Sequence, residues 1–482
     1  MKKLSVLLFI IAVFASCQKF LDVNVTPNNP TAVPPSAILT STQLSLGFLN
    51  SNDLGRAPSL LMQYTAGIAN QPAAYDVYTL DGFFDNQWNS EIYGQSTSDL
   101  QILIDQYSAT SPAYSGIAKI QLAYVYSVAT DLWGEVPYSQ GGQGLKFRNP
   151  RFDKQEDIYL GNASLGIISL FDLVRSGISD LSKPSVLKPG TDDVIYKGDL
   201  SKWIRAGNTM LLKFAMQVSN RAPDTTKAVI QSVLTGNNFI NSNALDLEVP
   251  FGTTVGNQNP LYVYNFITRP GDQMLSSRLL VLSKSLNDTV RLAKFFTKPG
   301  PGGNFTAFNN GSTAAPPAQA TRSKYNVYLT GTAGEAPIRL LTNFQVQFIL
   351  AESALLFGTT GVAQTYYQTG IRANMQKIGM TTAEIDNYFA TNPTVVTLTG
   401  TTEQMREQII TQKYLAWVGN GIEAYNDYRR TRYPFLPLVL NPSGDNPNVI
   451  PERLPYTPGE LAANPNAPKP RPKTDVKVWW AQ

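Results

Sequence analysis

The residues that decide the fold are FQVQFILAESALLFGTTGVAQTYYQTGIRANMQKIG, at positions 344–379. Apolar side chains recur every three or four residues along two successive segments, and a glycine, Gly358 or Gly379, ends each segment. The two stripes consist of Phe344, Phe348, Ala351 and Leu355, and then of Tyr367, Ile371, Met375 and Ile378. One face of each segment is therefore apolar, and the pattern predicts two amphipathic helices that pack as a hairpin.

The hairpin spans about 35 residues, which is the length of a tetratricopeptide unit. Similar stripes predict further helices on both sides of it. Ser111 is expected to cap one of these helices, Asp199 a second, and Thr401 with Gln404 a third through a capping box. Alternating patterns typical of strands are few. The sequence therefore predicts a mostly α protein in which tetratricopeptide-like helix pairs stack as a partial solenoid.

Long irregular stretches separate the predicted helices. The largest covers about residues 237–335, and a shorter one covers about residues 71–88. Aromatic side chains are frequent in both, whereas disordered segments lack them, so we expect these insertions to be loops with a function. Residues 441–472 are rich in Pro and Asn and are expected to wrap over the surface. No linker-like run divides the chain, which predicts a single domain over residues 17–482.

The N-terminus has the pattern of a lipoprotein signal peptide over residues 1–16. Two lysines, Lys2 and Lys3, precede an apolar run that is too short to cross a bilayer, and Ala15-Ser16 stands directly before Cys17. We expect cleavage before Cys17 and attachment of acyl chains such as palmitate to that cysteine. The alternative is an ordinary secretory signal followed by an incidental cysteine.

Composition excludes several kinds of chemistry. The chain has no histidine, and Cys17 is its only cysteine, so Ser-His-Asp hydrolysis, Cys-His catalysis, His-ligated zinc and disulfides are all excluded. The net charge of +4 is small for 482 residues, and the basic residues are scattered, which argues against a nucleic-acid partner. Only 15% of the residues are charged. Such a surface suits a neutral polar ligand, and we expect no cofactor and no metal.

Three motifs follow one another along the chain. They are DLWGEVPY at residues 131–138, LSKWIRAGNTMLLK at residues 200–213, and ITQKYLAW at residues 410–417 with EAYNDYRRTRYP at residues 423–434. In this order they resemble the motifs of the SusD/RagB family of nutrient-binding outer-membrane lipoproteins, in the SusD-like branch with the RRT-x-YP ending. Lys213 stands where the family usually has arginine, and Tyr425 where it has tryptophan. The resemblance covers nearly the whole chain after Cys17.

The resemblance implies binding and delivery without catalysis. SusD-like proteins are lipid-anchored at the outer membrane, face the cell exterior, bind oligosaccharides or other nutrients, and cap a SusC-like TonB-dependent transporter. Their fold is a helical scaffold with tetratricopeptide-like helix pairs and long loops that form the ligand site. We therefore expect an oligosaccharide-binding protein of this kind. The identity of the nutrient and the face of the membrane stay open.

The ligand site is predicted in the two insertions. Sugar rings stack on flat aromatic faces, and amides, carboxylates and guanidinium groups bind their hydroxyls. The insertion at residues 71–88 lies where SusD-like proteins that bind glucans carry site aromatics, and the longer insertion has a similar mixture of side chains. The candidate ligand residues are Tyr75, Asp76, Tyr78, Asp81, Phe83, Phe84, Asn257, Asn259, Tyr262, Tyr264, Asn265 and Arg269.

Two other functions stay open. A surface glycoside hydrolase would need two carboxylates, for which Asp131 and Glu135 are candidates, but a spacing of four residues does not establish their separation. A structural or adhesive lipoprotein would bind protein through its helix pairs. Trp133 and Tyr138 in the first motif are predicted to pack in the core, and Asp427, Arg429 and Arg430 in the last to form a structural network. Asp22 and its neighbours lack the order of a calcium-binding loop.

Overall fold

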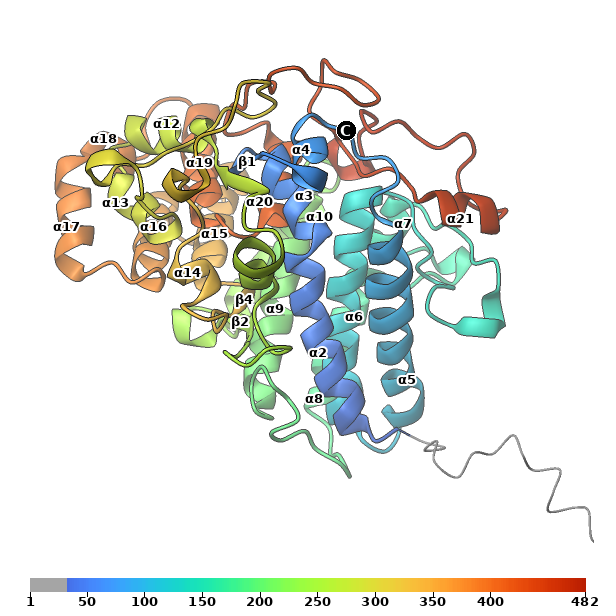
Figure 1. Ribbon diagram of the computed structural model, residues 1–482. Helices are drawn as coiled ribbons and strands as arrows, with labels where there is room; N and C mark the ends of the chain where they lie inside the picture. Colours follow the sequence, from blue (N-terminus) through green and yellow to red (C-terminus); the bar gives the residue numbers. More distant parts are fainter. Residues whose placement is uncertain (1–32) are drawn as a thin grey trace, which may run out of the picture.

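Helices form the body of the protein, as Figure 1 shows for a computed structural model that describes residues 33–482. The predicted signal peptide and Cys17 lie outside the described residues. In the N-terminal half, the long helix α6 packs against α5 and α8, and α9 packs against α8 and α10. The helices of this half are α2 (Pro35–Ser51), α3 (Asp53–Leu61), α5 (Ser98–Tyr107), α6 (Pro112–Trp133), α7 (Gln155–Leu160), α8 (Leu170–Leu181), α9 (Leu200–Gln217) and α10 (Pro223–Gly236). Consecutive helices are thus neighbours, as in a stack of hairpins.

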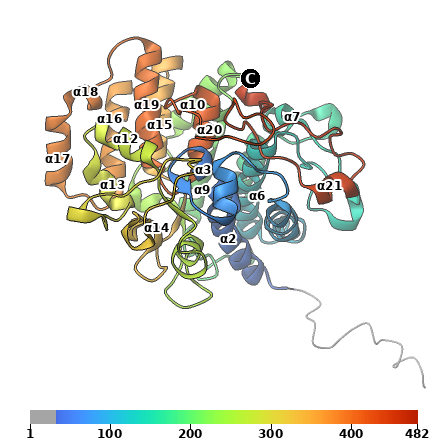
Figure 2. The same ribbon diagram turned by 45° about the horizontal axis from the view of Figure 1, so that its top comes forward.

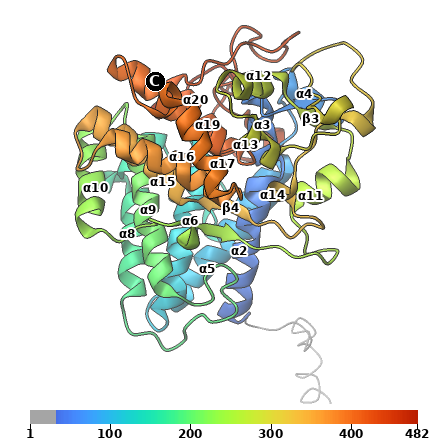
Figure 3. The ribbon, with the colours of Figure 1, turned by 90° about the vertical axis from the view of Figure 1, so that its left-hand side faces the viewer.

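The C-terminal half continues the stack. Helices α15 and α16 form the predicted hairpin, and α19 packs against both, as the side view in Figure 3 shows. This half contains α15 (Asn343–Phe357), α16 (Ala363–Lys377), α17 (Thr382–Thr391), α18 (Pro393–Val396), α19 (Thr402–Ala416) and α20 (Gly421–Thr431). Helix α15 also contacts α9, and α20 contacts α3. The mostly α fold with helix pairs is confirmed.

All three residues predicted as N-caps stand at the N-cap position of a helix, and two of them cap it through their side chains. The Asp199 carboxylate accepts hydrogen bonds from the amides of Ser201 and Lys202, and Thr401 with Gln404 forms a capping box. Ser111 is the N-cap residue of α6, with Pro112 at the first helical position, as predicted. Its side chain, however, caps no amide of α6 and instead accepts a hydrogen bond from the amide of Leu187, 3.2 Å away.

The two insertions contain more regular structure than the sequence suggested. Residues 71–88 run through α4 (Asn70–Asp76) into the π-helix η1 (Gln87–Thr97). Residues 237–335 hold the short helices α11 (Pro260–Tyr262), α12 (Ser277–Ser285), α13 (Thr289–Phe295) and α14 (Val327–Thr330), and the π-helix η5 (Val263–Thr268). Two antiparallel strand pairs tie the long insertion to the body: β1 (Thr65–Gly67) with β3 (Gln273–Leu275), and β2 (Leu247–Val249) with β4 (Ile338–Leu341).

The C-terminal segment crosses the top of the molecule with little regular structure, apart from α21 (Pro458–Ala463) and the turn η8 (Trp479–Ala481) (Figure 2). Its end returns to the body beside α20. The Trp133 indole donates a hydrogen bond to the carbonyl of Pro455 at 2.9 Å, and Trp480 is fully buried. The segment thus closes one end of the core over α6.

Residues of the three sequence motifs join helices to one another. Arg429 on α20 donates to the carbonyl of Asp131 at the end of α6, at 2.6 Å, and Arg430 binds Glu352 of α15 through both terminal nitrogens, at 2.6 and 2.7 Å. Lys213 on α9 forms an ion pair with Glu423 of α20 at 2.6 Å. All of these side chains are buried. Arg430 also donates to Asp427, so the structural network predicted for Asp427, Arg429 and Arg430 is confirmed.

No helix within residues 33–482 is both long enough and apolar enough to span a bilayer. The same residues contain no group of three or more Asp, Glu and Cys side chains placed to hold a metal ion. Asp22 and its neighbours, considered above for calcium, lie outside the part of the chain that the structure describes.

Candidate ligand-binding site

A hollow of about 480 Å³ lies where the junction of α2 and α3 faces the insertion segment 255–268. Sites for small organic ligands have volumes of this order. Aliphatic and aromatic side chains dominate its lining, and a few polar side chains lie among them. The lining residues are Phe48, Asn52, Arg56, Val255, Gly256, Gln258, Pro260, Val263, Tyr264, Ile267 and Thr268. We refer to the cavity that these residues line as the Tyr264 hollow.

The first wall of the hollow comes from the break between two helices. Asn52 is both the C-cap residue of α2 and the N-cap residue of α3, and its non-helical backbone conformation ends one helix and begins the next. Phe48 lies one turn earlier on α2, and Arg56 one turn later on α3. With spacings of four residues, one aromatic ring, one amide and one guanidinium group line the hollow together.

The second wall is built by α11 and the π-helix η5. Asn259 caps this segment: its side-chain oxygen accepts the amide of Leu261, and its side-chain nitrogen donates to the carbonyls of Leu329 and Ala336. Pro260 follows at the first helical position, where a missing N–H costs nothing. The wider turn of a π-helix, which is frequent at functional sites, then places Val263, Tyr264 and Ile267 in the hollow.

Arg56 and Tyr264 join the two walls. The guanidinium carbon of Arg56 lies 3.4 Å from the centroid of the Tyr264 ring, a cation–π contact, and Arg56 also forms an ion pair with Asp53. The Tyr264 hydroxyl donates to Asp272 at 3.1 Å, and burial raises the pKa of Tyr264 above its usual value. Because Asp53 neutralises Arg56, the hollow presents guanidinium hydrogen-bond donors without a large excess of charge.

A buried polar layer supports the first wall. Asp53 accepts hydrogen bonds from the Tyr75 hydroxyl at 3.2 Å and the Gln87 amide at 3.0 Å. The Asn52 side-chain nitrogen donates to Glu91 at 2.8 Å. Burial raises the pKa of Glu91 to about 7, although the hydrogen bond from Asn52 lowers it. Asn52 thus connects the hollow to a carboxyl group that changes charge near neutral pH.

Most of the predicted ligand residues in the insertion at 71–88 are covered. Tyr75, Asp76, Tyr78 and Phe84 are at most 2% exposed. Tyr75 stacks on Phe84, with ring centroids 5.7 Å apart, and Asp76 accepts hydrogen bonds from Asn310 and the amide of Gly311. Phe83 is half-buried against the Tyr75 ring, and Asp81 is exposed, 3.5 Å from Arg471. The segment contacts the first wall through the hydrogen bond from Tyr75 to Asp53, and none of its residues lines the hollow.

The predicted ligand residues of the long insertion lie in different surroundings, and only one of them lines the hollow. Tyr264 lines the hollow, whereas Asn259 and Asn265 are buried and bound to the backbone of neighbouring residues. Tyr262 is half-buried and stacks on Phe266, with ring centroids 5.5 Å apart. Asn257 and Arg269 are exposed at the two ends of the segment. The structure therefore brings only Tyr264 of the twelve predicted residues into the lining.

Sequence reasoning missed the rest of the lining. Asn52 and Arg56 lie at the junction of α2 and α3, and the polar run Ser51-Asn52-Asp53 was the available signal of a break there. Val255, Val263 and Ile267 carried no signal, because aliphatic residues in a loop are usually assigned to packing.

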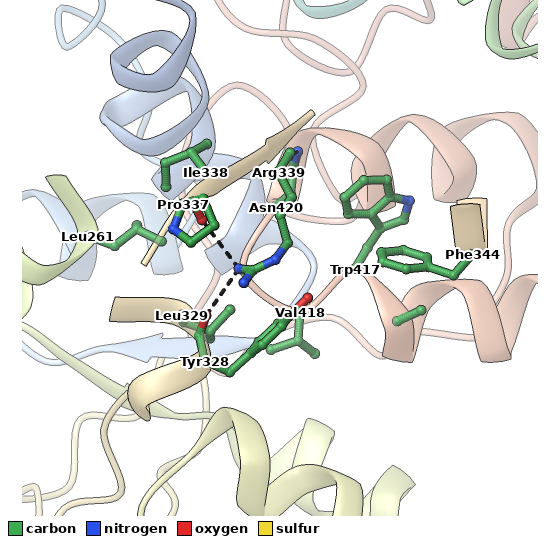
Figure 4. Close-up of a pocket in the computed structure, with 12 residues that line it drawn as sticks. Leu261, Tyr328, Leu329, Pro337, Ile338, Arg339, Phe344, Trp417, Val418 and Asn420 are labelled. Atoms are coloured by element: carbon green, nitrogen blue, oxygen red, sulfur yellow. Dashed lines mark hydrogen bonds between the residues drawn. The ribbon is translucent and has the colours of Figure 1, made fainter. Parts of the chain in front are cut away.

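A second cavity has a volume of only about 20 Å³ (Figure 4). The guanidinium group of Arg339 lies 3.7 Å from the centroid of the Tyr328 ring and donates to the carbonyls of Tyr328 and Pro337, at 3.1 and 3.3 Å. Trp417 packs against Phe344 on the other side. A cavity of this size holds about one water molecule, so it is a feature of the core.

The carboxylates considered for hydrolysis differ in their surroundings. Asp131 is 1% exposed and accepts hydrogen bonds from Tyr159, Asn426 and Trp480 at 2.8 to 2.9 Å. Glu135 is exposed. A carboxylate enclosed in this way does not reach a glycosidic bond, so these two residues do not form a catalytic pair.

Comparison with known proteins adds a family and a set of similar structures. A family model described as SusD-like, starch-binding and associating with the outer membrane matches residues 27–457. A comparison with curated proteins gives no match.

Several solved structures share the fold over most of their length. One described as a chitin-binding protein is 25% identical, with a TM-score of 0.76, and the match covers 93% of this chain and 100% of that one. A SusD homologue from Bacteroides uniformis is 24% identical, with a TM-score of 0.73 and coverage of 93% and 98%. A SusD/RagB family protein from Bacteroides thetaiotaomicron is 22% identical, with a TM-score of 0.77 and coverage of 93% and 99%.

Proposed function

The chain belongs to the SusD-like family of starch-binding, outer-membrane-associated proteins, and on that basis we propose that it binds an oligosaccharide nutrient in the Tyr264 hollow. The observation that carries the proposal is the match of this carbohydrate-binding family over residues 27–457, together with a ligand-sized hollow between the scaffold and the long insertion. A similar structure is described as a chitin-binding protein, which also supports a glycan ligand.

The chemistry of the hollow suits a neutral ligand. Phe48, Val263 and Ile267 offer apolar surface to the C–H face of a sugar ring, while Asn52 and Arg56 offer hydrogen bonds to its hydroxyl groups. The Arg56 charge is matched by Asp53. The hollow thus has the mixture of apolar surface and a few polar groups that binding sites for small molecules commonly have.

We also propose a location and a partner for the protein in the cell envelope. Residues 1–16 would be removed as a signal peptide, acylated Cys17 would anchor a single domain over residues 17–482, and the protein would face the cell exterior. A SusC-like TonB-dependent transporter would receive the bound nutrient. Co-purification of a large β-barrel protein with the chain extracted from outer membranes in mild detergent would support this part, and extraction of the chain alone would count against it.

Calorimetry with a panel of neutral oligosaccharides tests the proposed ligand class. Replacement of Ile267 by arginine places a long charged side chain at the mouth of the hollow, and we expect affinity for the bound glycan to fall by about 10-fold or more. Ile267 is 58% exposed, so the fold should tolerate the change.

Ile168→Arg is the matched control, because Ile168 is 61% exposed and lies outside the hollow. It should leave affinity unchanged. Undiminished binding by Ile267→Arg would show that the glycan binds elsewhere. Failure of every oligosaccharide in the panel to bind would count against a glycan ligand.

A further inference from the structure

We propose that the Tyr264 hollow selects sugars that carry an N-acetyl group, by enclosing the acetyl methyl group between aliphatic side chains and binding the amide at Asn52 and Arg56. This inference rests on the proposed glycan function and adds the ligand's chemical class. It follows from two features of the hollow: aliphatic side chains that are exposed, and hydrogen-bonding groups of Asn52, Arg56 and Gln258 that neighbouring residues leave available.

Most of the aliphatic side chains of the hollow come from the segment 255–268. Val255, Val263 and Ile267 line the hollow together with Pro260 and the Phe48 ring. Val255 is 89% exposed and Ile267 is 58% exposed, although exposed aliphatic side chains gain nothing from contact with water. A sugar hydroxyl placed against them would lose its hydrogen bonds to water without replacement. A methyl group placed there would leave water and cover the aliphatic surface.

The polar groups of the first wall complement an amide. The Asn52 side-chain nitrogen is used by Glu91, and its oxygen accepts no hydrogen bond from residues 33–482, so it can accept an amide N–H. Arg56 uses one terminal nitrogen for Asp53, and its other N–H groups can donate to an amide carbonyl. Gln258 donates to the carbonyl of Ala333 through its nitrogen, which leaves a second side-chain oxygen at the hollow.

The charge balance of the hollow argues against a sugar acid as the ligand, and the elements that form its walls argue against an extended peptide. A sugar acid would need an uncompensated cation, but Asp53 pairs with Arg56. An extended peptide is commonly bound by adding a strand to a sheet edge. The walls of the hollow are α2, α3, α11, η5 and the loop before α11. None of the lining residues belongs to a strand. A neutral N-acetylated sugar therefore fits the observed groups best.

The experiment compares two sugars that differ at one position of each ring. Chitohexaose carries an acetamido group where cellohexaose carries a hydroxyl group, and both have the same linkage. Titration calorimetry of the purified chain should give an affinity for chitohexaose at least about 10-fold higher, because one apolar group in a fitted pocket changes affinity by about 10- to 200-fold.

Ile267→Ser should reduce this ratio several-fold, because it should lower affinity for chitohexaose more than affinity for cellohexaose. Ile168→Ser, the matched exposed position, should leave both affinities unchanged, and circular dichroism checks that both variants fold. A ratio that Ile267→Ser does not change would overturn the inference.

Other results separate this inference from the proposed function. Equal affinities for the two sugars would overturn selectivity for N-acetyl groups and leave glycan binding in place. Binding of a different neutral glycan without binding of chitohexaose would likewise overturn selectivity for N-acetyl groups and leave glycan binding in place. If a peptide mixture binds and no glycan does, both the inference and the glycan function are wrong.

Discussion

At the scale of single residues, Asn52 and Glu91 link the Tyr264 hollow to the interior of the protein. Asn52 lines the hollow, and its side-chain nitrogen donates to a carboxyl group that is 8% exposed. The second oxygen of Glu91 has no hydrogen-bond partner among the described residues. A buried carboxyl group in such surroundings favours its protonated form.

This predicts a pH dependence of stability. Burial raises the pKa of Glu91 from 4.5 to about 7. In the unfolded chain the carboxyl group ionises above about pH 4.5, whereas in the folded protein it keeps its proton up to about pH 7. The favourable contribution is therefore complete below pH 4.5 and is lost as the pH rises through 7. We expect Glu91→Gln to flatten the fall in unfolding free energy between pH 5 and 8 by about 1–3 kcal/mol.

Urea denaturation at several pH values measures this effect. Asp76 and Asp246 also have pKa values raised to about 7, mainly by burial, so the variant should keep part of the pH dependence. A variant with the same pH dependence as the parent protein would contradict the assignment to Glu91.

Prediction from sequence at this scale was weakest for the lining of the hollow. Tyr75 and Tyr78 have the side chains of a sugar site, yet both are buried, and Tyr264 is the predicted residue that lines the hollow. Aromatic content marks a loop as ordered, but it does not tell whether a ring faces solvent or the scaffold. That depends on contacts over long sequence distances, such as the hydrogen bond from the amide of Val439 to the Tyr78 hydroxyl.

At the scale of elements, the regular helices were predictable and the irregular ones were not. The stripes of the α15–α16 hairpin and the caps of α9 and α19 follow from local rules. The π-helices η1 and η5 leave no such signal, because one or two turns with a slightly different period do not clearly alter the pattern of a short segment. Both π-helices border or support the hollow, so the site falls where local rules say least.

An ion network between elements allows a second prediction. Glu352 on α15 is buried and accepts two hydrogen bonds from Arg430 on α20 and one from Arg406 on α19. Burial alone would raise the pKa of Glu352, but the charges of Arg430 and Arg406 hold it at about 2. We expect Glu352→Gln to lower the free energy of unfolding by about 3–5 kcal/mol, because Arg430 keeps a buried charge with too little compensation.

The stabilisation by Glu352 should be present above about pH 4.5 and lost as the pH falls toward 2, since its pKa is lowered in the folded state. Guanidinium denaturation of the variant at pH 7 measures the loss. Asp386→Asn is a suitable control, because its ion pair with Arg372 is exposed and contributes little. A loss below about 1 kcal/mol for Glu352→Gln would contradict this account of the network.

At the scale of the whole molecule, a stack of helix pairs carries a long insertion that closes over one side of the scaffold. The strand pairs β1–β3 and β2–β4 fasten the insertion before and after the hollow. Helix periodicity predicted the stack, and the motifs identified the family. The position of the insertion could not be predicted, because it depends on pairings between residues about 90 to 210 positions apart.

The central claim is that a neutral glycan binds between the α2–α3 junction and η5. A crystal structure of the chain with the tightest-binding oligosaccharide tests this claim most directly. The account predicts a sugar ring in contact with Val263 and Ile267, with Asn52 or Arg56 hydrogen-bonded to it. A sugar bound only at another surface, with the Tyr264 hollow empty, would contradict the account.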